Sequence, residues 1–235
     1  MKVFKFGGAS VKNAEAVINI ASILNTYRKE MLVIVVSAMD KTTNAMEELV
    51  IAHYNQDTNT TKKLKKTKDF HYDIIDTLFE NKKKGQVVAR IDKLFNELEN
   101  ILNEDPVDNY NYEYARIVCY GELISTSIIH EYLVSKNMAT DWVDARKIIK
   151  TNNDYREAQI NWSQTEKNIH KNISPSIKNN TLVITQGFIG SPPENMTSTL
   201  GREGSDYTAA IIGSVLNAEY VAVWKDVSGI LNADP

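Results

Sequence analysis

The chain has 235 residues, of which 43% are hydrophobic and 24% are charged, and its formal net charge at pH 7 is −3. This length can bury the core of one large α/β domain, and the weak negative charge gives no reason to expect nucleic acid as the main partner. Because Cys119 is the single cysteine, no internal disulfide can form and nothing points to an oxidising compartment.

The first residues, MKVFKFGGAS, lack the long apolar stretch of a signal peptide. Residues 2–6 are apolar-rich and end at a Gly-Gly pair, which predicts a strand followed by a turn. No run of 18 apolar residues occurs in the sequence, so we expect neither a membrane-spanning helix nor a membrane partner. A soluble cytoplasmic protein is the default expectation.

The next two elements complete a βαβ unit. Apolar residues from Val11 to Leu24 recur at helical spacing. Residues 31–36 (MLVIVV) form a continuous apolar run, which is typical of a strand buried on both faces of a sheet. A strand, a helix and a strand in close succession predict parallel pairing.

The middle of the chain is mainly helical by pattern. Residues 45–103 place apolar residues among charges at helical spacing, and we interpret the lysine runs at 62–68 and 82–84 as solvated faces. Residues 114–120 are expected to be extended or irregular, and residues 121–135 are expected to form another helix.

The last part of the chain returns to alternating strands and helices. Residues 152–180 resemble a helix plus a connector, and residues 181–185 (TLVIT) predict a buried strand. Residues 191–199 should form a loop, residues 205–216 a helix, and residues 220–224 (YVAVW) the last clear strand. Without repeats or a flexible linker, the pattern predicts one α/β domain over residues 1–235.

Glycines recur where the predicted strands end. Gly7 and Gly8 follow the first strand, and Lys5 lies inside that strand directly before them. Glycine lets the backbone approach a phosphate, and open α/β sheets bind ligands at the carboxyl ends of their strands. The alternative is a tight turn with Lys5 as an edge lysine that faces water. Neither the P-loop nor the dinucleotide-binding fingerprint occurs.

Residues 198–209 (STLGREGSDYTA) gather hydroxyls, two glycines, Arg202 and Asp206 at the start of a predicted helix. Arginine is suited to bidentate binding of a carboxylate. Ser205 or Asp206 could serve only as a helix cap, but a cap does not account for Arg202 together with both glycines.

Six segments, in this order, resemble the signature segments of aspartate kinases, which belong to the wider amino-acid kinase family. They are KFGGAS (5–10), VSAMDKTTN (36–44), GELIS (121–125), QGFIG (186–190), STLGREGSDYTAA (198–210) and WKDVSGILNADP (224–235). The KFGG and GSD segments are partly shared with glutamate, acetylglutamate, carbamate and UMP kinases, whereas GELIS and TTN point more narrowly to aspartate. The resemblance implies a three-layer α/β/α sandwich with a mainly parallel central sheet.

The resemblance also implies roles for residues around the nucleotide. Lys5 would contact the transferring phosphoryl group, and Asp206 would orient Lys5. The phosphate-binding and catalytic loops would include Gly7, Gly8 and Ser37. Lys225 and Asp226 would lie beside the adenosine.

A second group of residues would surround L-aspartate: Thr43, Glu122, Phe188, Arg202 and Ser205. By resemblance, Arg202 would take a substrate carboxylate and Glu122 would face the α-amino group. A carboxylate at this position favours a substrate that carries an ammonium group.

The implied reaction transfers the γ-phosphoryl group of ATP to the side-chain carboxylate of L-aspartate and gives 4-phospho-L-aspartate, which enters lysine, threonine and methionine biosynthesis. The carboxylate is ionised at pH 7 and needs no general base, so catalysis depends on alignment and charge neutralisation. Mg²⁺ is expected to bind through the ATP phosphates, with no protein ligand. The resemblance also suggests a homodimer.

The sequence departs from the family pattern at three positions. Lys225 stands where the family usually has Thr, Glu203 where it often has a second glycine, and Ala9 where it usually has Thr. Aspartate kinases normally continue into further nucleotide-binding segments and two ACT regulatory domains, so we expect a C-terminally truncated kinase domain without a feedback site. Two alternatives stay open: another amino-acid kinase, such as glutamate kinase, or an inactive substrate-binding fragment.

Overall fold

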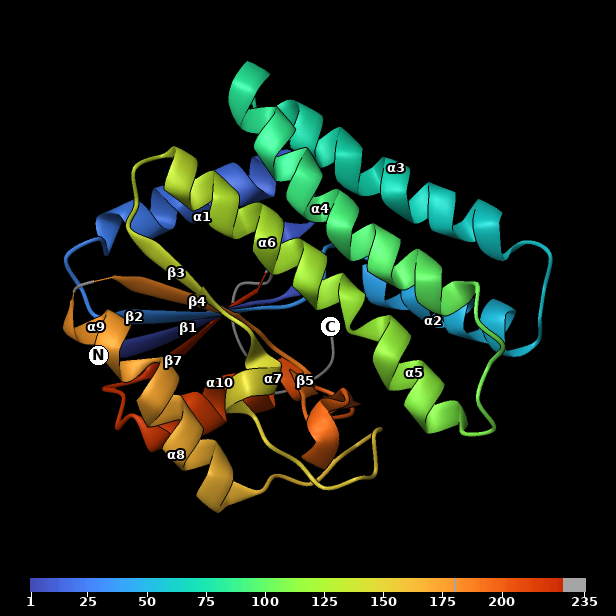
Figure 1. Ribbon diagram of the computed structural model, residues 1–235. Coiled ribbons are helices and arrows are strands. Elements are labelled where there is room, and N and C mark those ends of the chain that lie inside the picture. The colour runs from blue at the N-terminus through green and yellow to red at the C-terminus, as the bar shows by residue number, and fades with distance from the viewer. Residues whose placement is uncertain (180, 226–235) are drawn as a thin grey trace, which may run out of the picture.

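Five parallel strands form the main sheet of the residues that the computed structural model describes, which are 1–179 and 181–225 (Figure 1). The strands are β1 (Lys2–Phe6), β2 (Leu32–Val36), β3 (Thr140–Val143), β4 (Leu182–Gln186) and β7 (Val221–Trp224). Their order is β3-β4-β2-β1-β7, and every neighbouring pair is parallel. A small antiparallel pair joins β5 (Ile189–Gly190) to β6 (Ser198–Thr199).

The central strands are apolar on both faces because helices cover both. Phe4 and Ile34 point into one hydrophobic core, whereas their neighbours Val3 and Val33 point into another on the opposite face. Successive side chains of a strand alternate between faces, so a strand between two helical layers reads as one continuous apolar run. The sequence prediction for β2 is therefore confirmed.

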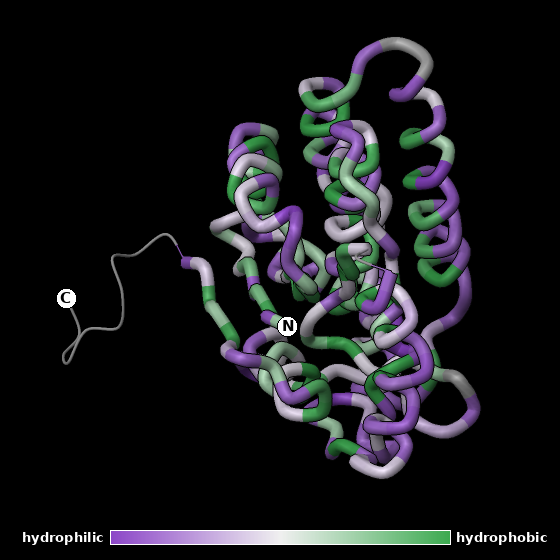
Figure 2. Tube along the Cα trace, turned by 90° about the vertical axis from the view of Figure 1, so that its left-hand side faces the viewer, coloured by the Kyte–Doolittle hydropathy of each residue, from purple (hydrophilic) through white to green (hydrophobic). Residues whose placement is uncertain are grey.

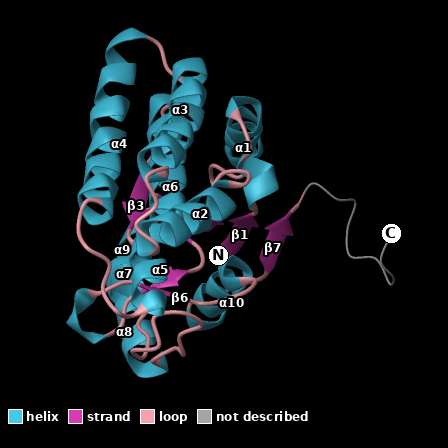
Figure 3. Cartoon of the chain, turned by 90° about the vertical axis from the view of Figure 1, so that its right-hand side faces the viewer, coloured by secondary structure: helices cyan, strands magenta, loops and turns pink. Residues whose placement is uncertain are grey.

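Helices form a layer on each side of the sheet (Figures 1 and 3). The larger side holds α1 (Ala14–Thr26), α2 (Thr42–Tyr54), α3 (Thr60–Leu78), α4 (Asn81–Leu102), α5 (Tyr110–Val118) and α6 (Tyr120–Ser135). The other side holds α8 (Trp162–Asn172), α9 (Ser174–Lys178) and α10 (Gly204–Val215). Three short helices, η1 (Gly8–Val11), α7 (Ala145–Ile148) and η2 (Pro193–Asn195), lie in connections.

The long helices are amphipathic, and hydrophobic and hydrophilic residues alternate along them (Figure 2). In α3, Leu64 and Ile75 are buried while Lys62, Lys65 and Lys66 are exposed. The first lysine run therefore forms a solvated face, as its pattern predicts. Among the described residues, no helix is long and apolar enough to cross a membrane.

One expectation from the sequence is wrong. Residues 114–118 belong to α5, and Tyr120 begins α6 after a turn at Cys119. Asn109 caps α5 because its side chain accepts a hydrogen bond from the Tyr112 backbone N–H at 3.1 Å. Tyr114 and Val118 are then buried on the inner face of α5, so the cap and tertiary packing outweigh the preference of tyrosine for strands.

Gly187 allows the end of β4 to pack against the start of α10. A Cβ atom at this position would lie 2.5 Å from the Cβ and Oγ atoms of Ser205 and 2.7 Å from its Cα. We therefore expect Gly187→Ala to lower the free energy of unfolding by about 1–3 kcal/mol, as overpacking usually does, and to shift the residues at the start of α10.

Denaturant unfolding of Gly187→Ala tests this expectation, with Gly85→Ala in α4 as the control. A Cβ atom at Gly85 would meet nothing within 4 Å, so this helix-interior change should stabilise the protein by about 0.5–1 kcal/mol. A Gly187→Ala variant as stable as the parent would show that the contact between β4 and α10 is not tight.

Candidate active site

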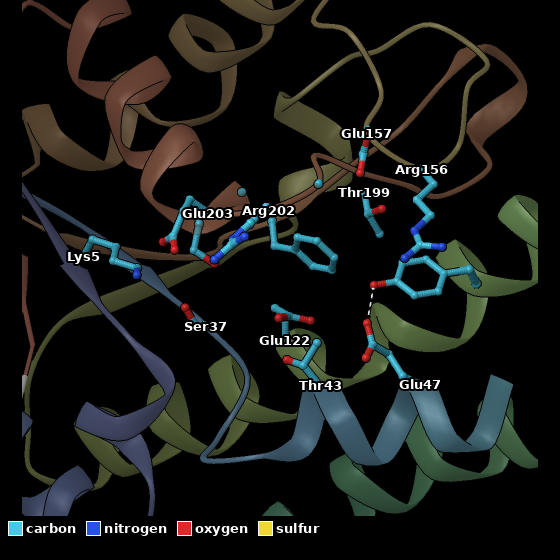
Figure 4. A pocket seen from close by; sticks show the side chains of 15 residues that line it. Lys5, Ser37, Thr43, Glu47, Glu122, Arg156, Glu157, Thr199, Arg202 and Glu203 are labelled. Carbon is cyan, nitrogen blue, oxygen red and sulfur yellow. Dashed lines mark hydrogen bonds between the residues drawn. The ribbon is translucent and has the colours of Figure 1, made fainter. Parts of the chain in front are cut away.

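A cavity of about 380 Å³ lies where β1, β2 and β4 end (Figure 4). Its lining includes seven of the residues singled out from the sequence, which are Lys5, Ser37, Thr43, Glu122, Phe188, Arg202 and Ser205. They come from β1, the loop after β2, α2, α6, the loop after β4 and the region that opens α10. The parallel sheet brings these segments together because the carboxyl ends of its strands share one edge.

Lys5 and Asp206 form an ion pair beside the cavity. The Lys5 ammonium lies 3.0 Å from Asp206 Oδ1, and the side chains are 7% and 26% exposed. Burial by itself would raise the pKa of Asp206, but Lys5, together with Glu203 and Lys225, outweighs it and holds that pKa below its ordinary value. The carboxylate therefore stays charged and holds the ammonium at the carboxyl end of β1.

Gly7 and Gly8 let two loops meet next to Lys5. A Cβ atom at Gly8 would lie 3.0 Å from the backbone oxygens of Ala38 and Asp40, and one at Gly7 would lie 3.6 Å from Lys5 Nζ. The Asp40 backbone N–H donates to the Gly8 carbonyl at 3.1 Å. Both predicted glycines therefore lie close to Lys5 and to the loop after β2, although neither lines the cavity itself.

Glu122 is a buried carboxylate with one oxygen unpaired. It lies in the first turn of α6 and is 2% exposed. Its Oε1 accepts a hydrogen bond from the Ala38 N–H at 3.3 Å, whereas Oε2 has no partner among the described residues. Burial raises the pKa of Glu122 to about 8. A buried, ionised carboxylate destabilises the folded protein unless a cation pairs with it, so the site is suited to an ammonium group.

The loop that carries Arg202 forms the roof of the cavity. Glu203 has a φ of 54°, in the left-handed region, which costs a non-glycine residue roughly 1–2 kcal/mol. This conformation explains why glycine suits the position of Glu203. Arg202 is exposed, and no carboxylate of the described residues lies within ion-pair distance of it, so its guanidinium is free to bind an anion.

The nucleotide-side predictions are only partly covered by the structure. Lys225 follows β7, is exposed, and contributes to the lowered pKa of Asp206, so its charge acts on the Lys5 end of the cavity although it is not a lining residue. Asp226 lies outside the described residues. Within those residues, no group of three or more His, Cys, Asp or Glu side chains could hold a metal ion.

Four lining residues at the other end of the cavity were not predicted: Glu47, Tyr114, Arg156 and Glu157. Arg156 lies in a polar stretch that resembles a connector, and Tyr114 lies in the segment expected to be irregular. No spacing or motif singles them out, because only the tertiary fold brings their three segments together.

The comparison with known families agrees with this architecture. A sequence model of the amino acid kinase family matches residues 1–235. The chain belongs to the amino acid kinase family. Its five-stranded parallel sheet with helices on both faces is the fold of that family, as the sequence resemblance implies.

Several of the similar proteins are aspartokinases. Over 99% of its length the chain is 31% identical to the lysine-sensitive aspartokinase 3 of Escherichia coli, and 28% identical to a bifunctional aspartokinase/homoserine dehydrogenase of Arabidopsis thaliana. It spans 50% of the first relative and 26% of the second. A crystal structure of E. coli aspartokinase III, which is in complex with aspartate and ADP, matches 98% of the chain and 50% of its own, at 30% identity and a TM-score of 0.88.

Proposed function

We propose that this kinase-family chain carries the active site of an aspartate kinase, which phosphorylates the side-chain carboxylate of L-aspartate with ATP. One observation carries the proposal: a single cavity holds the Lys5 ammonium, fixed by Asp206, and the unpaired buried carboxylate oxygen of Glu122. The positive charge of Lys5 suits a phosphoryl group, and the negative charge of a Glu122 carboxylate suits the ammonium group of an amino acid. The similarity to aspartokinases supports the same substrate.

The reaction needs no proton transfer. A side-chain carboxylate oxygen attacks the γ-phosphorus, the bond from that phosphorus to the β,γ-bridging oxygen breaks, and ADP leaves with the bonding electrons. The product is an acyl phosphate. Because the nucleophile and the nucleotide are both anionic, the protein contributes mainly positive charge and alignment. Lys5 would supply the charge at the transferring group, and Arg202 would hold the reacting carboxylate.

ATP is proposed to bind over Gly7, Gly8 and Ser37, with its adenosine towards Lys225 and Asp226. Mg²⁺ would neutralise the phosphates and be held by phosphate oxygens. In this assignment the carboxylate of Asp206 is engaged with Lys5 and is left out of the metal coordination. A homodimer in the cytoplasm belongs to the same proposal. A monomer in analytical ultracentrifugation would contradict the proposed dimer.

A coupled assay for ADP release tests the function, with L-aspartate, L-glutamate and N-acetyl-L-glutamate as acceptors. Turnover with L-aspartate alone is the expected result, because an acylated amine cannot pair with Glu122. A preference for L-glutamate would assign another amino-acid kinase. Aspartate binding in calorimetry without turnover would identify a substrate-binding fragment.

A further inference from the structure

Arg156 lies at the end of the cavity opposite Lys5 (Figure 4). Its guanidinium carbon is 4.3 Å from the centre of the Tyr114 ring. The Tyr114 hydroxyl in turn donates a hydrogen bond to Glu47 Oε1 at 2.8 Å. Stacking and this hydrogen bond join three separate segments, which are the 152–160 loop, α5 and α2, into one wall of the cavity.

The loop around Arg156 is held in a strained shape. Tyr155 and Glu157, its two neighbours, have φ angles of 56° and 58°, which non-glycine residues rarely adopt. The loop is anchored to β6, because the Thr199 N–H donates to the Tyr155 carbonyl and the Ala158 N–H donates to the Thr199 carbonyl at 2.6 Å and 2.9 Å. Strain of this kind persists only where surrounding contacts enforce it, and it is frequent at ligand sites.

The guanidinium of Arg156 is stacked but not neutralised. No carboxylate of the described residues lies within ion-pair distance of it, and the residue is exposed to the cavity. Stacking on an aromatic ring uses the flat face of the guanidinium and leaves its N–H edge free. Arg156 is thus an oriented cation whose donors are ready for a planar anion.

Charged side chains of both signs line the cavity, and besides Glu47, Glu157, Arg202 and Glu203 they include three that follow one another along it. Lys5 stands at one end, Glu122 in the middle and Arg156 at the other end (Figure 4). An amino diacid carries the complementary order: a side-chain carboxylate, an ammonium group and an α-carboxylate. Resting on the proposed function, we propose that Arg156 binds the α-carboxylate of the amino-acid substrate, which leaves Arg202 for the reacting carboxylate. Arg156 is then a specificity-determining residue at a position that no sequence motif marks.

The test compares two acceptors on Arg156→Ala and Arg202→Ala: L-aspartate and its α-amide, L-isoasparagine, which lacks the α-carboxylate charge. The parent protein should prefer L-aspartate. Arg156→Ala should raise the KM for L-aspartate about 10- to 100-fold, which is the loss of affinity expected when one charge-assisted hydrogen bond is removed. The KM for the α-amide and the kcat for both acceptors should change little. Arg156→Lys should restore the preference only in part, because lysine lacks the planar fork.

Arg28→Ala is the matched control, since Arg28 is an exposed arginine just before β2, at the amino ends of the strands. It should match the parent with both acceptors. An equal loss with both acceptors in Arg156→Ala, or a preference abolished by Arg202→Ala and kept by Arg156→Ala, would overturn the proposal. Calorimetry with the same two ligands applies the same comparison if the chain binds without turnover. Turnover with another acid alone would instead contradict the proposed function.

Discussion

Lys5→Met should lower kcat with L-aspartate by about 10²–10³-fold, the usual effect of removing one preorganised donor from a transition state. Lys5 is 5% exposed and paired with Asp206, so its ammonium is fixed before substrate arrives and costs little to reorganise. Methionine keeps the length and the apolar packing of the side chain but removes its charge. Initial rates in the ADP-release assay, at saturating L-aspartate and ATP, measure the loss.

Lys2→Met provides the comparison within the same strand. Lys2 lies at the amino end of β1 and pairs with Glu30 at 3.0 Å, away from the cavity. The Lys2→Met variant should therefore keep the parent kcat. Thermal unfolding of both variants separates a chemical effect from a loss of folded protein. If Lys5→Met retained the parent kcat, Lys5 could not act on the transferring phosphoryl group.

Glu122→Gln should weaken the use of L-aspartate and strengthen the fold. Replacing a buried charged partner of an ammonium group costs about 2–5 kcal/mol, so we expect kcat/KM for L-aspartate to fall on the order of 10²-fold. Without substrate, however, the unpaired carboxylate oxygen of Glu122 destabilises the folded protein. Glutamine should therefore raise the free energy of unfolding at pH 8, by on the order of a few kcal/mol.

The pH dependence follows from the direction of the Glu122 shift. Its folded pKa of about 8 lies above the ordinary value of 4.5, so the folded state holds a proton that the unfolded state loses first. Stability should therefore fall as the pH rises from about 4.5 to about 8. Conversely, kcat/KM for L-aspartate should rise with pH up to about 8, because only the ionised carboxylate pairs with an ammonium group. Glu122→Gln should flatten both profiles.

Glu113→Gln tests whether the stabilisation is specific to Glu122. Glu113 is equally buried, but its carboxylate accepts hydrogen bonds from the Val107 N–H and Arg116 Nε, each at 2.8 Å, and lies 3.3 Å from His53 Nε2. Glutamine at position 113 should lower the free energy of unfolding, because it disrupts the hydrogen bonds that both carboxylate oxygens of Glu113 accept. In urea unfolding at pH 6 and pH 8, the free energy of unfolding should thus be higher than the parent's for Glu122→Gln and lower than the parent's for Glu113→Gln. A shift of the same sign in both would contradict our account of Glu122.

The strands and helices that a continuous apolar run or a helical period marks could be predicted from the sequence. β2 and β4 are buried on both faces, and their sequences show it directly. β3 escaped prediction because Asp141 is exposed on this edge strand, so its pattern is short and polar. The helical α5 was missed because its cap at Asn109 and the packing of Tyr114 act through the folded structure.

For the site, the sequence motifs led to one wall of the cavity and not to the other. Lys5, Glu122 and Arg202 lie in segments that resemble kinase signatures, and the fold gathers them in one place. The nucleotide contact of Asp226 stays a prediction. Arg156 and Tyr114 face each other only because α5 and the 152–160 loop meet in three dimensions, and neither segment carries a local signal of that contact.

The position of β1 in the sheet determines when the site can form during synthesis. Val3 pairs with Val33 on one side and with Val221 on the other, so the second strand that flanks β1 leaves the ribosome long after the first. The Lys5–Asp206 contact joins equally distant parts of the chain. Such non-local pairing slows folding, and the nascent chain exposes one edge of an apolar strand until its last partner arrives. We therefore expect the Lys5 ammonium to reach its position beside Asp206 in one of the final steps of folding.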